Sequence, residues 1–133
     1  MMRQNRLRTV LTILVVLLAA VLLISCGPAP RVPTSQLDTP EHHTYTGMKL
    51  LSQEKYADAQ REFELAIELD PKFSKAYTGI GLVKTYTADY NAAWASLKMG
   101  WKYAKDDAEK IFVYVSRIRY FTQGKPEKKW LEL

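Results

Sequence analysis

The feature that most constrains the fold is a repetition of the sequence at an offset of 34 residues. The offset aligns Gly47 with Gly81, Tyr56 with Tyr90, Ala59 with Ala93, Phe63 with Leu97, and Ala66 with Gly100. Periods of this length indicate stacked units of secondary structure, none of which can bury its apolar side alone. The sequence therefore predicts two copies of one unit that lie against each other.

Apolar spacing within each copy predicts a pair of helices. Tyr56, Ala59, Phe63, Ala66 and Ile67 recur at the spacing of one helix face. Thr39 is a suitable N-cap, with Pro40 at the first helical position. Ser74 is expected to cap the third helix, and Asp106 or Asp107 the fifth. The sequence thus predicts an all-α domain with helices at about 40–53, 56–69, 75–87, 90–104 and 108–122.

The same pattern resembles the tetratricopeptide repeat, a helix-turn-helix unit. The matching signature residues are Gly47, Ala59, Phe63, Ala66 and Pro71 in the first repeat, and Tyr77, Gly81, Ala93 and Leu97 in the second. The departures are His43, Thr46 and Lys105, which stand where the family usually has Trp, Leu and Pro. The resemblance implies a right-handed stack of helical hairpins, with repeats at about 40–73 and 74–107 and a C-terminal capping helix at about 108–122.

The expected capping helix is apolar on several sides, which usually means burial on several sides. Ile111, Val115 and Ile118, with Phe121 or Thr122, are expected to face the preceding repeat, whereas Phe112, Val113, Tyr114 and Tyr120 fall on other faces. Two explanations stay open. Either the tail 123–133 folds back with Trp130 and Leu131, or the helix packs against a second chain.

The N-terminal segment has the composition of a secretory signal. Residues 1–8 contain three arginines and no acid, and residues 10–24 are apolar except for Thr12. The following Leu-Ile-Ser-Cys, residues 23–26, resembles the lipobox of bacterial lipoproteins. This resemblance implies cleavage after Ser25 and attachment of a diacylglyceryl group to Cys26. Two other readings are an uncleaved membrane anchor, or an ordinary cysteine near a plain cleavage site.

The expected organisation is a signal peptide at 1–25, a lipidated cysteine with a proline-rich tether at 26–38, and a helical domain at 39–133. Glycine at position 27, instead of the Asp that retains enterobacterial lipoproteins in the inner membrane, favours the outer membrane. We therefore expect the domain to face the periplasm in the cell envelope. Because Cys26 is the only cysteine, an internal disulfide is excluded.

No catalytic constellation stands out, so we expect a protein that is not an enzyme. His42 and His43 are the only histidines, and neighbours on a helix point about 100° apart. We expect no metal and no cofactor apart from the covalent lipid. Glu62, Glu64 and Glu68 are expected to be solvated. Nucleic acid is excluded as a partner by the expected location outside the cytoplasm.

The resemblance to the repeat family also implies a groove that binds a peptide or partner protein. The implied groove residues are Glu41, Thr44, Met48, Leu51, Lys75, Thr78, Leu82, Thr85, Phe112 and Arg119, with Glu109 and Ser116 in the same register. Met48 and Leu82 are equally compatible with a place in the core. We therefore expect a scaffold or assembly factor that binds another envelope protein. The alternative is a structural homo-oligomer that associates through residues 108–122.

Overall fold

The computed structural model describes residues 38–124, and this part of the chain is all-α. The helices are α2 (Pro40–Ser52), α3 (Tyr56–Leu69), α4 (Ser74–Tyr86), α5 (Tyr90–Tyr103) and α6 (Asp107–Gly124). The expected all-α class is confirmed for these residues, and each helix ends within two residues of its expected bounds. None of the helices in 38–124 is long and apolar enough to cross a membrane. The expected signal peptide, the lipidation of Cys26, most of the tether and the fold-back of the tail lie outside the described residues.

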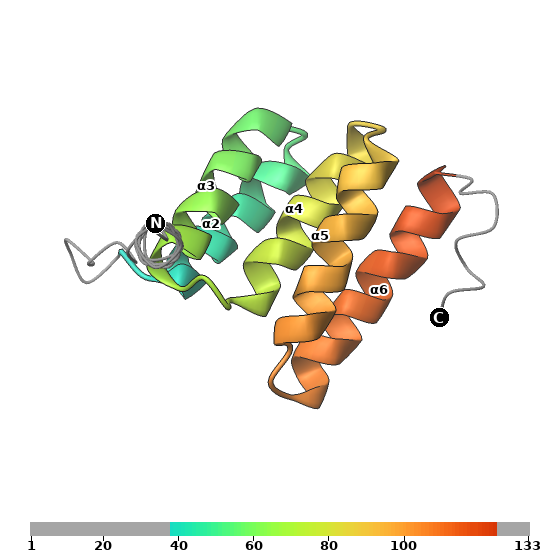
Figure 1. Ribbon diagram of the computed structural model, residues 1–133. Coiled ribbons are helices and arrows are strands. Elements are labelled where there is room, and N and C mark those ends of the chain that lie inside the picture. Colours follow the sequence, from blue (N-terminus) through green and yellow to red (C-terminus); the bar gives the residue numbers. More distant parts are fainter. Residues whose placement is uncertain (1–37, 125–133) are drawn as a thin grey trace, which may run out of the picture.

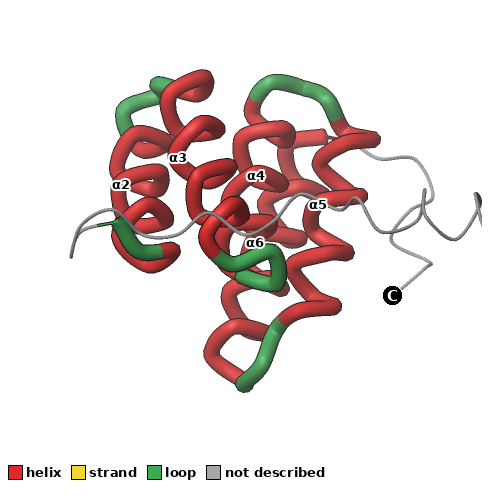
Figure 2. The backbone as a smooth tube through the Cα atoms, turned by 60° about the vertical axis from the view of Figure 1, so that its left-hand side comes forward, coloured by secondary structure: helices red, strands yellow, loops and turns green. Residues whose placement is uncertain are grey.

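The helices form two hairpins and one further helix (Figures 1 and 2). α2 packs against α3, and α4 packs against α5. α4 also contacts α2, α3 and α6, so it joins the first hairpin to the rest of the domain. α6 lies beside α5 at the far end of the row from α2 (Figure 1).

The two hairpins repeat each other in their bounds and in their turns. α4 and α5 begin and end 34 residues after α2 and α3. Each hairpin turn contains one residue in the left-handed region, Glu54 with φ of 59° and Ala88 with φ of 61°. These two residues are also 34 positions apart, so the turns reverse the chain in the same way.

Side-chain caps begin three of the helices. Thr39 accepts a hydrogen bond from the backbone N–H of His42, as expected. Asp89 and Asp106 accept from backbone N–H groups in α5 and α6 in the same manner. The prediction that Ser74 caps the third helix is wrong, because its hydroxyl donates instead to the carbonyl of Gly100 on α5. Ser74 therefore links α4 to α5 and does not cap the start of α4.

The fully buried ring of Phe63 on α3 lies between α2 and α4. A Cβ atom added to Gly47 would lie 2.7 Å from Cε1 of this ring, and one added to Gly79 would lie 2.4 Å from it. Likewise, a Cβ on Gly81 would lie 2.7 Å from Cγ of Leu97. The close approach expected at Gly47 and Gly81 is therefore confirmed, and Gly79 adds a contact that the 34-residue alignment did not predict.

The buried face of α6 is not the expected one. Val113 and Tyr120 are fully buried, whereas Ile111, Val115 and Ile118 are 61%, 48% and 61% exposed. The prediction that these last three residues face the preceding repeat is wrong. The two stripes are offset by two residues, or about 200° of rotation, so they lie on opposite sides of the helix. The side of α6 that carries Val113 and Tyr120 is the buried one, because the ring of Tyr120 stacks on Trp94 of α5 with centroids 5.5 Å apart.

Arg117 is buried in the same interface between α5 and α6. Its guanidinium carbon lies 5.2 Å from the ring centroid of Trp94 and 5.4 Å from that of Trp101. No ion pair involves Arg117 within residues 38–124, and its burial lowers the pKa of the guanidinium. The electron-rich ring faces are thus its main electrostatic partners in this part of the chain.

Candidate binding pocket

A pocket opens where α2, α4 and α6 come together. Its volume is about 290 Å³, near the lower end of the range for sites that hold small organic molecules. Seven residues line it: Glu41, Thr44, Tyr45, Met48, Phe73, Lys75 and Phe112. A hollow of this size suits one or two large side chains of a partner rather than a whole cofactor.

The walls of the pocket are mostly apolar, and the core holds them in place. Phe73 is buried, and Met48 and Phe112 are partly buried against the core between the two hairpins. Tyr45 is 71% exposed, which places it at the rim. Burying an apolar side chain against walls of this kind contributes about 25 cal/mol per Å² removed from water. The pocket can therefore bind an apolar side chain without rearranging its own walls.

Two opposite charges border this apolar surface. Glu41, in the first turn of α2, and Lys75, in the first turn of α4, both line the pocket and are exposed. Thr44 adds a buried hydroxyl that has no hydrogen-bond partner within the described residues. Charges at the rim fix the register of a partner more than they add affinity. The border of the pocket therefore carries one negative and one positive side chain, on different helices.

Five of the expected groove residues meet in this pocket, namely Glu41, Thr44, Met48, Lys75 and Phe112. They come from three helices, so the arrangement depends on how α2, α4 and α6 pack together. Tyr45 and Phe73 also line the pocket, although they were not predicted to do so. Helical spacing could have indicated Tyr45, because it lies four residues after Glu41 on the same face of α2. Phe73 precedes α4, where helical spacing gives no guide.

The other expected groove residues lie elsewhere. Leu51, Thr78, Leu82 and Thr85 are buried, so the expectation that they line an open groove is corrected. These four side chains lie between packed helices instead of at the surface. The two threonines tolerate burial because each hydroxyl donates to the carbonyl four residues earlier, on Ser74 and Gly81 respectively.

The remaining groove residues are on α6. Glu109 and Ser116 are buried, and the Glu109 carboxylate accepts a hydrogen bond from the backbone N–H of Lys105. Arg119 is exposed, and it donates to the Tyr86 hydroxyl at 3.1 Å rather than lining the pocket. Of the residues expected on α6, Phe112 alone lines the pocket.

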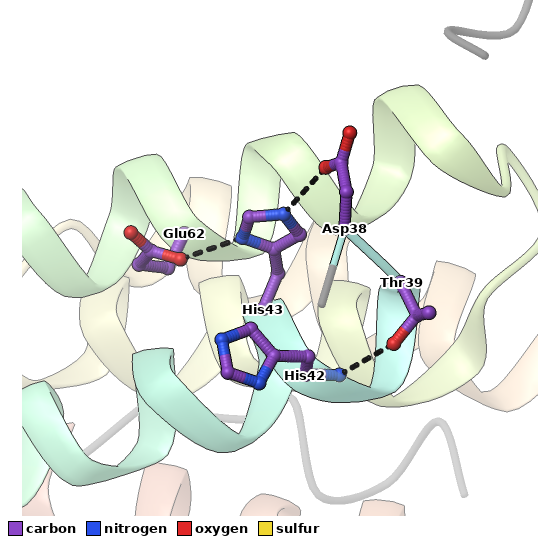
Figure 3. Close-up of polar contacts among 5 residues, drawn as sticks. All are labelled: Asp38, Thr39, His42, His43 and Glu62. Atoms are coloured by element: carbon purple, nitrogen blue, oxygen red, sulfur yellow. Dashed lines mark hydrogen bonds and ion pairs between the residues drawn. The ribbon is translucent and has the colours of Figure 1, made fainter. Parts of the chain in front are cut away.

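A second polar cluster lies at the start of α2, around His43 (Figure 3). The Nδ1 atom of His43 is 2.7 Å from a Glu62 carboxylate oxygen, and its Nε2 atom is 3.0 Å from a carboxylate oxygen of Asp38. Burial lowers the pKa of His43, but its hydrogen bonds to Glu62 and Asp38 outweigh that effect and leave the pKa above 6.5. The cationic ring can donate to both carboxylates at once.

This arrangement corrects the expectation that Glu62 is a solvated surface residue, since it is partly buried and hydrogen-bonded. His42 is exposed, and its backbone N–H rather than its ring is bonded to Thr39 (Figure 3). Within 38–124 no cluster of His, Cys, Asp and Glu side chains has the makings of a metal site. The His43 cluster therefore ties the first turn of α2 to α3.

Comparisons with protein-family models, curated proteins and solved structures gave no match.

Proposed function

We propose that this chain is a membrane-anchored tetratricopeptide-repeat lipoprotein that acts as a scaffold or assembly factor in the bacterial cell envelope. The observation that carries the proposal is the apolar pocket between α2, α4 and α6, with Glu41 and Lys75 at its border. A preformed apolar hollow bordered by opposite charges suits a peptide segment that presents a bulky apolar side chain. The proposal assigns no catalytic step and no cofactor beyond the lipid.

The repeat assignment is supported by the exact recurrence of helix bounds. Two hairpins at a 34-residue offset share a left-handed residue in each turn, Glu54 and Ala88. They also share a glycine on the first helix that faces a large apolar side chain on the second, Gly47 with Phe63 and Gly81 with Leu97. In a repeat array the first helices of successive hairpins line the inner surface. The equivalent helices here, α2, α4 and α6, are the ones that line the pocket.

The anchor assignment is supported by the sequence around Cys26, where an arginine-containing segment, an apolar run and a small residue precede the cysteine. Two or more acyl chains give stable membrane attachment where a single chain is marginal. The proposed anchor places the domain at the periplasmic face, with the outer membrane favoured over the inner.

The partner is tested by crosslinking in cells. A photoreactive residue in place of Tyr45 at the rim is expected to give one main crosslinked partner protein, identified by mass spectrometry. Met48→Lys puts a charge on the apolar wall and should abolish that product. The same photoreactive residue in place of Glu64, which is exposed on α3, is the matched control and should not capture this partner. A product that survives Met48→Lys, or no product at all, would contradict the proposed pocket.

The anchor is tested separately with a metabolic label. Growth with an alkyne-bearing fatty acid should label the chain, and Cys26→Ser should remove the label and release the chain from the membrane fraction. A labelled Cys26→Ser chain would contradict lipidation at this position while leaving the pocket proposal intact.

A further inference from the structure

α6 carries an apolar stripe on the side opposite to its buried face. Ile111, Tyr114, Val115 and Ile118 are 61%, 47%, 48% and 61% exposed, and they follow one another at helical spacing. Tyr114 lies at the edge of this stripe, where its ring centroid is 4.7 Å from that of Trp101 on α5. Single exposed apolar residues are common on protein surfaces, but a contiguous stripe indicates a site of contact. We call these four residues the outer face of α6.

The repeated architecture indicates what covers this face. Gly47 on α2 faces Phe63 of α3, and Gly81 on α4 faces Leu97 of α5. The next position in the 34-residue series is Val115, at the centre of the outer face. On α2 and α4 this position is covered by the segment that directly follows the helix in the chain. The equivalent segment after α6 begins at Lys125, outside the described residues.

We propose that residues 125–133 lie along the outer face of α6, with the side chains of Trp130 and Leu131 against it. The sequence of this segment is KPEKKWLEL, and Pro126 cannot continue α6. From Gly124 back to Ile111 the helix rises about 20 Å at 1.5 Å per residue. Seven residues after Pro126 span up to about 23 Å, which covers that distance. Trp130 falls near the middle of the face.

The type of residue at position 115 also argues for this occupant. Glycine at the equivalent positions 47 and 81 lets a second helix come close, whereas the branched side chain of Val115 keeps a following backbone farther away. A third helix could therefore not pack on α6 as closely as α3 packs on α2, whereas an extended segment can lie farther from the α6 backbone.

The size of the face favours a tethered segment over a second copy of the chain. Four partly exposed side chains offer roughly 400 Å² of apolar surface, a patch that single chains can carry. A stable dimer commonly buries about 800 Å² on each partner, of which about 450–500 Å² is apolar, so a second copy would also have to bury polar surface around this face. A covalently linked segment has an effective concentration in the millimolar range, so it needs a smaller interface.

The test places p-benzoylphenylalanine at position 115 of the full chain, in cells, with crosslinks mapped by mass spectrometry. The expected product keeps the mass of one chain and joins position 115 to a residue in 125–133. Trp130→Ala should abolish this crosslink, and the conservative Trp130→Phe should retain it. The same photoreactive residue in place of Glu64 on α3 should give no link to 125–133 and serves as the control.

Other outcomes overturn the inference. A product of twice the mass would assign the face to a second copy, a product of any other mass to a different protein, and a link to lipid to the membrane surface. No link to 125–133 from position 115, repeated from position 118 to exclude a local effect of the substitution, would also overturn it.

Discussion

Gly79→Ala is expected to destabilise the domain even though alanine is the better helix former. The added Cβ would lie 2.4, 2.5 and 2.6 Å from Cε1, Cζ and Cδ1 of Phe63. That ring is fully buried, and it is confined on the α2 side by Gly47, where an added Cβ would also lie 2.7 Å from it. The ring has no room to move aside, so α3 and α4 must separate or the ring must leave its preferred rotamer.

The expected magnitude is the difference between two opposing effects. Overpacking a well-filled core costs about 1–3 kcal/mol. Replacing glycine by alanine within a helix contributes up to about 1 kcal/mol in the opposite direction. With three ring atoms inside contact distance, we expect the free energy of unfolding to fall by about 1–2 kcal/mol.

The assay is a double-mutant cycle with Phe63→Leu, measured by urea denaturation and circular dichroism on a chain that begins at residue 26 with Cys26→Ser. Leucine removes the ring atoms, so in that background Gly79→Ala should become neutral or stabilising. Ala95→Gly, at an exposed position within α5, measures the helix propensity difference in this protein. The steric reasoning is refuted if Gly79→Ala stabilises the chain with Phe63 present, or destabilises it equally in both backgrounds.

Three further predictions concern stability. The raised pKa of His43 contributes stability that is complete below its unfolded value of about 6.5 and is lost as pH rises through the folded pKa. Urea titrations should therefore show stability falling as the pH rises above about 6.5, and His43→Gln but not His42→Gln should flatten this dependence. Arg117→Lys should lower the unfolding free energy by about 1 kcal/mol, because lysine cannot stack its charge on two indole rings, whereas the exposed Arg119→Lys should change it much less. Ala88→Gly should raise the melting temperature, because alanine in the left-handed region costs about 1 kcal/mol that glycine does not. An unchanged or lower melting temperature would contradict this.

The position of the elements was predictable because it depends on local chemistry. Thr39 and Pro40 mark the start of α2 through a cap and a fixed φ. Gly47 and Gly81 mark two close contacts, because a Cβ at either position would collide with a large side chain on the paired helix. Each of these signals depends on residues within one helix or one hairpin, and the 34-residue repetition presents the same signal a second time.

The hydrogen bonds between His43 and its two carboxylate partners could not be predicted from such local signals. Its carboxylate partners are Asp38, five residues earlier, and Glu62, on the next helix. Spacing placed Glu62 on the polar side of α3, which is correct for the helix alone. Only the packing of α2 on α3 brings that side within reach of the imidazole ring.

By itself the sequence determined that this part of the chain is helical, where each helix begins and ends to within two residues, and that Gly47 and Gly81 permit close approach. The tertiary structure alone decided which side of α6 is buried and which of the expected groove residues reach a common pocket. The physical reason is that helical periodicity fixes the angles between side chains on one helix but not the rotation of that helix against its neighbours. On α6, with apolar residues on opposite sides, stacking of Tyr120 on Trp94 sets that rotation and leaves Ile111, Val115 and Ile118 exposed.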